Sequence, residues 1–233
     1  MLYLLPNVLF DGELATDQLP PSVGVAVSQL TGLIAESEKE GRRFLRRFSF
    51  PAPKTFREIP IHLLNEHTAS SGKKELLAEI KKGGVWGLVS DCGMPCLADP
   101  GADLVLMARQ HAIPIQTFAG PSSILFALVL SGLGGQHFTF HGYLPREEAL
   151  LAQELKRMEM LPSTHLFIET PYRNLKLFHK LLSTLNPKTW LCVACDLSSP
   201  TQYVETDTMG GWKKKDPPEI DKRPTVFVIK KFS

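Results

Sequence analysis

Short apolar runs alternate with longer polar or amphipathic segments along most of this chain. Residues 2–5 and 85–89 are apolar runs too short for helices, and turn-forming residues bound them; residues 32–36 and 115–118 are predicted as two further short strands. Such runs are typical of buried strands in a parallel sheet. Between them, segments such as residues 72–82 place their apolar side chains on one helical face. The pattern predicts an α/β fold whose first part holds a mostly parallel sheet.

The second part of the chain repeats this pattern with one difference. Residues 202–205 alternate polar and apolar positions, which predicts an antiparallel or edge strand and therefore a mixed sheet. A charged helix at residues 148–160 follows the first alternating block, and we place the domain boundary just before it. The predicted lobes are residues 1–146 and 147–233. Further strands are predicted at residues 138–144, 164–169, 189–195 and 225–230, and a further helix at 172–185.

The most constrained stretch runs from residue 86 to residue 121. After the strand at 85–89, Gly93 and Pro95 predict a tight loop, and Asp99 is expected to cap a helix that begins at Pro100. After the next strand, the turn at residues 119–123 offers a serine to cap a helix at 124–131. Rigid loops at the carboxyl ends of neighbouring strands form ligand crevices in open α/β sheets. We therefore expect the ligand site here.

Four strings in this order carry a family resemblance: LVSDCGMPCLADPG, AGPSS, FHGYLPRE and FIETPYR. Together they resemble the successive signatures of the tetrapyrrole methylase family of S-adenosylmethionine-dependent methyltransferases, and most closely its branch that methylates small-subunit ribosomal RNA. The resemblance covers nearly the whole chain. It implies two αβα lobes, the first with a mostly parallel sheet and the second with a mixed sheet, and a ligand cleft between them.

The resemblance also implies residues that line the cofactor. S-adenosylmethionine presents an adenine edge, a ribose diol, a sulfonium and an amino acid head, so its site needs closely approaching backbone groups and a few polar side chains. The dinucleotide fingerprint G-x-G-x-x-G is absent. As alternatives, Asp91 caps a turn and the serines merely cap helices. The implied cofactor-binding residues are Pro6, Asp91, Gly93, Met94, Pro95, Ser122, Ser123, Thr170, Ala194, Pro224 and Thr225.

Substrate contacts are expected near residues 36–47. Glu36, Arg42 and Arg43 match the AEDTRxTRRLL string of the RNA-methylating branch, whereas residues 37–39 depart from it. The arginines there are candidates for binding phosphate groups. The alternative is a solvated helix face whose arginine stems pack on the sheet.

The catalytic base stays open. A ribose 2′-hydroxyl acceptor would need one, and the candidates are Glu36, Asp91, Glu169 and His141. Nothing in their spacing chooses among them, and His141 also fits a satisfied strand residue.

Composition and charge exclude only a few classes of protein. The formal net charge of +2 commits the chain to neither nucleic acid nor membrane. No apolar run approaches the roughly 18 residues of a membrane span, and the first residues predict a strand rather than a signal peptide, so we expect a cytoplasmic protein. Cys192 and Cys195 lie in a predicted strand at a spacing that sends them to opposite faces. We therefore expect all four cysteines, Cys92 and Cys96 included, to be buried thiols rather than a metal site or a disulfide.

Three functions follow from these patterns. The leading hypothesis is an S-adenosylmethionine-dependent methyltransferase acting on rRNA, at a ribose 2′-oxygen of a small-subunit cytidine by resemblance. The second is the same chemistry on a tetrapyrrole or another small acceptor. The third is a non-catalytic module that binds the cofactor or docks on the ribosome, which the altered string at residues 36–39 keeps open. The resemblance also implies a homodimer.

Overall fold

The computed structural model describes residues 1–12 and 15–232 and divides the chain into two compact units. Unit 1 is Met1–Ser122 and unit 2 is Ser123–Ser233. The division therefore lies between Ser122 and Ser123, earlier than the boundary between residues 146 and 147 that the sequence pattern predicts.

Unit 1 contains a five-stranded sheet in the order β3-β2-β4-β1-β5, and all four strand pairs are parallel. The chain leaves β1 toward β2 on one side and leaves β4 toward β5 on the other, although β1 and β4 are neighbours. This adjacency makes their carboxyl ends a topological switch point, where open α/β sheets bind ligands. The elements are β1 (Leu2–Leu5), α1 (Pro21–Ser28), β2 (Gly32–Ala35), α2 (Glu38–Leu45), β3 (Ile61–Leu63), α3 (Ser70–Lys81), β4 (Trp86–Val89), α4 (Ala102–Gln110) and β5 (Ile115–Thr117), with 3-10 helices η1 (Ala15–Gln18) and η2 (Phe56–Glu58).

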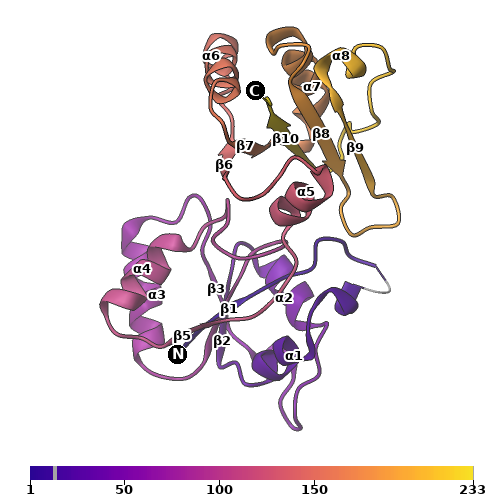
Figure 1. The fold of residues 1–233 in the computed structure, drawn as a ribbon. Helices are drawn as coiled ribbons and strands as arrows, with labels where there is room; N and C mark the ends of the chain where they lie inside the picture. Colours follow the sequence, from indigo (N-terminus) through magenta and orange to yellow (C-terminus); the bar gives the residue numbers. More distant parts are fainter. Residues whose placement is uncertain (13–14, 233) are drawn as a thin grey trace. The chain divides into compact units, whose positions relative to one another are not determined.

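Helices cover both faces of this sheet (Figure 1). On one face α1 and α2 bury Val23, Val27 and Phe44 against the strands. On the other face α3 and α4 bury Leu77 and Leu104. Every residue of β2 and β4 is buried, which explains why these strands are continuous apolar runs rather than alternating ones.

Unit 2 contains a mixed sheet in the order β6-β7-β10-β8-β9. The β6 and β7 strands are parallel, β10 is antiparallel to both β7 and β8, and β9 is an antiparallel edge strand. The predicted mixed sheet and antiparallel edge strand are thus confirmed. The elements are α5 (Ser123–Ser131), β6 (Phe138–Tyr143), α6 (Glu148–Glu159), β7 (Thr164–Ile168), η3 (Pro171–Arg173), α7 (Asn174–Thr184), β8 (Trp190–Cys195), β9 (Tyr203–Thr208), α8 (Met209–Trp212) and β10 (Thr225–Lys230).

Strand pairing explains why the two units divide before the predicted boundary at residue 146. Phe138 of β6 pairs with Thr164 of β7, and α5 packs against β8, β9 and β10 through side chains such as Ile124 and Leu128. Both elements precede residue 146 in the chain, yet their partners follow it. Such nonlocal pairing leaves no local trace in the sequence.

The strand β8 confirms the prediction for its two cysteines. Cys192 joins the cluster that contains α5, whereas Cys195 joins the cluster formed with α6, α7 and α8 on the opposite face. All four cysteines are free thiols, but only Cys192 and Cys195 are buried; Cys92 is exposed and Cys96 half-buried because they lie in the loop after β4, so the expected burial is wrong for Cys92. Within residues 1–12 and 15–232, no group of three or more His, Cys, Asp or Glu side chains is arranged to hold a metal ion.

Two predicted helix starts differ from the structure. The helix α4 begins at Ala102, and Gly101 occupies the N-cap position with no side-chain cap, so Asp99 does not cap it. The carboxylate of Asp99 instead hydrogen-bonds with Ser90. The helix α5 begins at Ser123 rather than at residue 124. In the described part of the chain, no helix combines the length and apolarity needed to cross a membrane.

Candidate functional site

Asn7 joins the loops that follow β1 and β4. Its side chain, only 3% exposed, donates to the carbonyl oxygens of Ser90 (3.0 Å) and Asp91 (2.8 Å). Its backbone exchanges two hydrogen bonds with Gly93, at 2.8 and 3.2 Å. Asn7 was not among the predicted site residues, although its position beside Pro6 and shortly after a buried strand is a usable signal.

The loop after β4 contains an unusual density of left-handed backbone. Gly93 has φ of 68°, Cys96 of 67°, Ala98 of 69° and Gly101 of 130°. Non-glycine residues rarely adopt positive φ, and such conformations persist only where the surroundings enforce them. An added Cβ at Gly101 would lie 2.9 Å from atoms of Cys96 and Leu88. The loop is therefore tightly determined by its packing.

The loop after β5 meets the other two loops at Gly120. A Cβ added there would lie 2.0 Å from Cβ of Pro6 and 3.4 Å from Sδ of Met94. The carbonyl oxygen of Pro121 lies near Gly93 in the same way, at 3.6 Å from a Cβ added there. Three strand ends of unit 1 thus converge, and they bring together the predicted cofactor residues of this unit: Pro6, Asp91, Gly93, Met94, Pro95 and Ser122.

Three carboxyl groups gather beside these loops, and we call Glu36, Asp91 and Asp99 the edge carboxylates. The backbone N–H of Asp91 donates to Oε1 of Glu36 at 3.1 Å. Burial raises the pKa of Glu36, the Asp91 N–H lowers it in part, and the negative charges of Asp99, Asp91 and Glu66 raise it further. Burial likewise raises the pKa of Asp91, with the charge of Glu40 adding to it.

The third edge carboxylate behaves in the same way. Burial raises the pKa of Asp99, its hydrogen bond with Ser90 lowers it, and the charge of Asp91 raises it again. Burial and the neighbouring carboxylates raise the pKa of the Cys92 thiol to about 11. Among the described residues, no lysine or arginine forms an ion pair with any edge carboxylate. The cluster is therefore a half-buried negative site without an internal counter-charge.

The arginines of α2 are mostly engaged within the protein. Arg42 donates to the carbonyl oxygens of Phe56 (3.0 Å) and Ile59 (2.6 Å). Arg43 is ion-paired with Asp11 and, at 3.3 Å, with Glu40. These two predicted substrate-binding residues thus have structural partners, which supports the alternative of arginine stems packed on the unit.

Arg47 has a more specific position. Its side chain is 12% exposed and donates to Oδ1 of Asn7 (3.0 Å) and to Asp11 (3.1 Å). Because Asn7 in turn holds the loop after β4, Arg47 links the segment that follows α2 to the converging strand ends. No motif in the sequence singled out this residue from its neighbours.

Unit 2 gathers its predicted residues at one edge of its own sheet. Thr170 follows β7, Ala194 lies near the end of β8, and Thr225 begins β10, which runs the other way. The N–H of Thr170 donates to Oε1 of Glu169 at 2.7 Å. The carbonyl oxygen of Pro224 accepts the N–H of Asp196 at 2.9 Å. Ser123 begins α5, in the same unit.

Two candidate bases in unit 2 already have partners. Glu169 is ion-paired with Arg173 at 3.2 Å. The ring of His141 contacts His165 through Nε2 and Nδ1 at 2.9 Å and lies 3.8 Å from Glu154. Burial lowers the pKa of His141, while Glu154 raises it. His141 is therefore a satisfied strand residue, as its sequence context allowed.

The unpaired edge carboxylates and the close loops of unit 1 fit S-adenosylmethionine chemically. Its sulfonium and ammonium groups are cations, and a cation beside this partly exposed carboxylate cluster offsets the burial and the neighbouring negative charges that raise the pKa of its members. Gly120 is exposed at the edge of these loops, which gives the close approach to backbone that an adenosine needs. Glu36, Asp91 and the loop at 93–95 are the groups that would hold the cofactor in this unit.

Proteins similar to this chain support the same choice of cofactor. The profile of the family described as Tetrapyrrole (Corrin/Porphyrin) Methylases matches residues 32–211. The chain is 28% identical over 211 residues to ribosomal RNA small subunit methyltransferase I of Xylella fastidiosa, covering 91% of this chain and 75% of that protein. It is 29% identical over 156 residues to the protein of the same name from Escherichia coli O157:H7, covering 66% of this chain and 54% of that one. These matches thus span from about half to three quarters of their relatives' length.

Solved structures share the fold. The methyltransferase CobJ superposes with a TM-score of 0.66 at 15% identity, covering 97% of this chain and 92% of its own. Uroporphyrin-III C-methyl transferase from Thermus thermophilus, complexed with S-adenyl homocysteine, gives a TM-score of 0.57 at 14% identity, covering 98% and 96%. These likenesses confirm the predicted fold class. With the profile match, they establish that the chain belongs to the tetrapyrrole methylase family of S-adenosylmethionine-dependent methyltransferases.

Proposed function

We propose that this chain transfers a methyl group from S-adenosylmethionine to ribosomal RNA of the small subunit. One observation carries the choice of acceptor: the alignment with a ribosomal RNA small subunit methyltransferase I extends over 91% of this chain. The structural likeness to tetrapyrrole methyltransferases lies below 20% identity and supports the fold only.

The chemistry of the edge carboxylates supports the choice of cofactor. S-adenosylmethionine supplies an electrophilic methyl group on a positively charged sulfur. Glu36 and Asp91 lack internal cations, so they provide the counter-charge in unit 1 while the loops at Gly93 and Gly120 receive the adenosine. Thr170, Ala194 and Thr225 are the proposed contacts from unit 2.

The same carboxylates are the best candidates for the base. We propose a ribose 2′-hydroxyl of a cytidine as the acceptor, whose proton must be removed as the methyl group arrives. Glu169 is held by Arg173 and His141 by His165, whereas Asp91 and Glu36 have no such partner. We therefore narrow the four candidates to these two.

Calorimetric titration of the purified protein tests the proposal first. We expect saturable binding of S-adenosylmethionine and S-adenosylhomocysteine, lost or weakened at least tenfold in Asp91→Ala. The matched control is Asp103→Ala on α4, which removes an exposed carboxylate paired with Lys73 and should bind normally. No binding to either ligand would contradict the methyltransferase proposal for this chain.

Methyl transfer from labelled cofactor into small ribosomal subunits tests the acceptor. We expect incorporation that nucleoside mass spectrometry locates on a 2′-O-methylcytidine. Transfer to a tetrapyrrole but not to subunits would favour the small-acceptor hypothesis, and tight cofactor binding without any transfer would favour the non-catalytic module. Light scattering of the same sample tests the proposed homodimer.

A further inference from the structure

A basic groove lies between α2 and the 3-10 helix η2 in unit 1. Its volume is about 470 Å³. Five of its lining side chains are cations, one is aromatic, and no acidic side chain lines it. The lining residues are Lys39, Arg42, Arg43, Arg46, Phe56 and Arg57.

The five cations differ in how far their charge is already compensated. Arg42 and Arg43 have the intramolecular partners described above. Lys39 is 89% exposed and reaches Glu40 only at 4.0 Å. Arg46 and Arg57 are exposed, and neither forms an ion pair within the described residues. Three cations of the groove are therefore free to contact an external anion, while the other two fix its walls.

The aromatic wall adds a second kind of contact. The guanidinium of Arg57 lies over the ring of Phe56, 5.3 Å from its centre. The ring is held because Phe56 packs against the apolar core of unit 1 and its carbonyl oxygen accepts from Arg42. A fixed ring beside a planar cation is a surface on which a nucleobase stacks.

The position of the groove relates it to the candidate site of the same unit. The helix α2 begins at Glu38, two residues after Glu36, so its first turn lies at the carboxyl edge of the sheet. From Lys39 to Arg46 the helix extends roughly 10 Å away from that edge. A nucleic-acid strand lying along the helix would place more than one phosphate against its cations and would end beside the edge carboxylates.

From this arrangement we propose that the groove binds the sugar–phosphate backbone of single-stranded RNA, with a base stacked on Phe56 and Arg57. The inference deepens the proposed function, on which it rests, by naming where the RNA strand is held. An acidic protein segment would use the cations but not the aromatic wall, so the combination favours nucleic acid.

Charge reversal at the two uncompensated arginines tests the groove. In the full chain we expect Arg46→Glu/Arg57→Glu to weaken binding of a fluorescent single-stranded RNA from the small subunit by about tenfold or more. Each lost phosphate contact should also reduce the slope of log affinity against log salt by about 0.7. Calorimetric binding of S-adenosylmethionine should stay unchanged and reports that the variant is folded.

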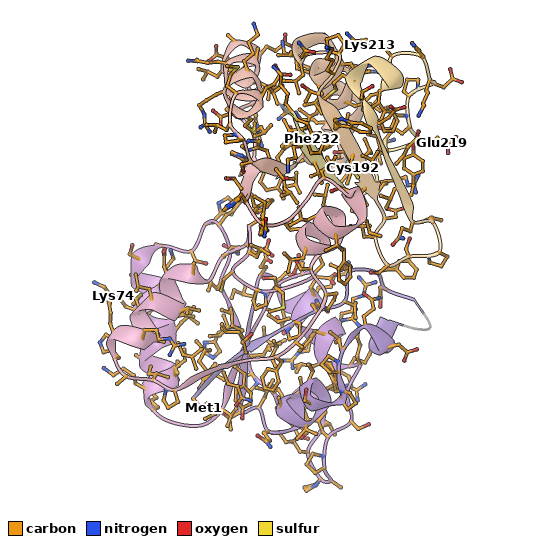
Figure 2. All side chains as sticks on the ribbon, in the orientation of Figure 1. Met1, Lys74, Cys192, Lys213, Glu219 and Phe232 are labelled. Carbon is orange, nitrogen blue, oxygen red and sulfur yellow. The ribbon has the colours of Figure 1, made fainter. Side chains whose placement is uncertain are left out.

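The control makes the same change of net charge elsewhere in unit 1. Lys74→Glu/Lys81→Glu alters two exposed lysines of α3, and the side chain of Lys74 projects away from that helix (Figure 2). We expect its RNA affinity to stay within about twofold of the unmodified chain, because the loss should be local rather than a response to overall charge.

The outcomes separate the groove from the proposed function. Equal weakening in both double variants, or none in either, would overturn the groove while methylation of subunits by the unmodified chain could still stand. Competition by polyglutamate as effective as by RNA would show an acidic protein as the ligand and overturn the RNA assignment. An unmodified chain that binds cofactor but neither binds nor methylates RNA would overturn both proposals.

Discussion

Each unit carries a group of acidic side chains, and the two groups behave in opposite ways. On β9 of unit 2, Glu205 and Asp207 both lie 2.6 Å from Lys215, and hydrogen bonds from that ammonium lower the pKa of each carboxyl. In unit 1, burial and the negative charges nearby raise the pKa of both Glu36 and Asp91, the nearby charges being Asp99, Asp91 and Glu66 for Glu36 and Glu40 for Asp91. Identical residue types thus form a neutralised surface pair in one place and an uncompensated cluster in the other.

This difference indicates what the first cluster is for. A compensated pair on an edge strand needs no ligand and contributes modestly to stability. An uncompensated, half-buried cluster costs stability in the free protein. Clusters of that kind gather at functional sites, where a ligand supplies the missing charge. The converging loops around the cluster of unit 1 support the same interpretation.

The largest effect is expected where the loops of unit 1 cross. In Gly120→Ala the new methyl group would overlap Pro6, whose Cβ lies 2.0 Å away, so the loops after β1 and β5 must separate. We expect a loss of about 3 kcal/mol in the free energy of unfolding, measured by denaturant titration, together with loss of cofactor binding.

The comparison variant for this prediction lies in unit 2. Gly132 has φ of 68°, and nothing lies within 4 Å of a Cβ added there. Gly132→Ala therefore carries backbone strain alone, about 1 kcal/mol. Equal losses in both variants would show that close approach of the loops does not matter.

A smaller effect is expected at Asn7. Asn7→Ala removes the donor to the carbonyl oxygens of Ser90 and Asp91 and leaves both poorly satisfied, which costs about 2 kcal/mol. Because the loop carrying Asp91 loses its anchor, affinity for S-adenosylmethionine should fall at least tenfold in a calorimetric titration.

A control separates stability from binding in that experiment. Thr164→Val removes a buried hydroxyl that donates to Leu133 and Gly134 at the amino end of β7. It should destabilise by a similar amount while cofactor affinity stays normal. If Asn7→Ala bound the cofactor normally, the anchoring role of Asn7 would be wrong.

The smallest effects concern pH and contrast the two acidic groups directly. A raised folded-state pKa means that the cost of ionising Glu36 appears as the pH rises above its unfolded value of 4.5. Glu36→Gln keeps the acceptor for the Asp91 N–H and removes this cost. Its melting temperature should therefore exceed that of the unmodified chain by on the order of a few degrees, only above about pH 4.5.

For the carboxylates of unit 2, ionisation is expected to stabilise the folded chain rather than destabilise it. A lowered folded-state pKa stabilises above the unfolded values of 4.5 for Glu205 and 3.8 for Asp207, and this stabilisation is lost as the pH falls through the folded values. Lys215→Met should melt slightly below the unmodified chain at neutral pH, and the two should converge in acid. Thermal melts of both variants across pH 3–7 measure the contrast. If both variants raised the melting temperature relative to the unmodified chain, or both lowered it, the contrast would be refuted.

Much of the local structure could be predicted from the sequence because its causes are local. The apolar runs identified β1, β4 and β8 nearly to the residue. Alternation identified β9 as an edge strand, although it extends to Thr208, beyond the predicted residues. Asp99 was predicted as a cap from its position before Pro100 and Gly101, but Ser90 competes for its carboxylate across the loop.

The candidate site could be predicted only in outline. The strand-end loops pointed to Asp91, Gly93 and their neighbours, and the structure gathers these residues with Pro6 at one edge. The roles of the arginines could not be read from their spacing. Arg42 lies on α2 and Arg47 lies just after its C-cap, yet one holds the loop before β3 and the other holds Asn7.

The sequence by itself determined the alternation of strands and helices, the rigid loops after β4 and β5, and the opposite faces of Cys192 and Cys195. These depend on side-chain period and on the backbone preferences of glycine and proline, which act over a few residues. The tertiary structure alone decided that β6 joins unit 2, that the edge carboxylates lack a cation, and which arginines face the basic groove. Those outcomes depend on contacts between residues far apart in the chain, whose pairing and charge balance exist only once the units have folded.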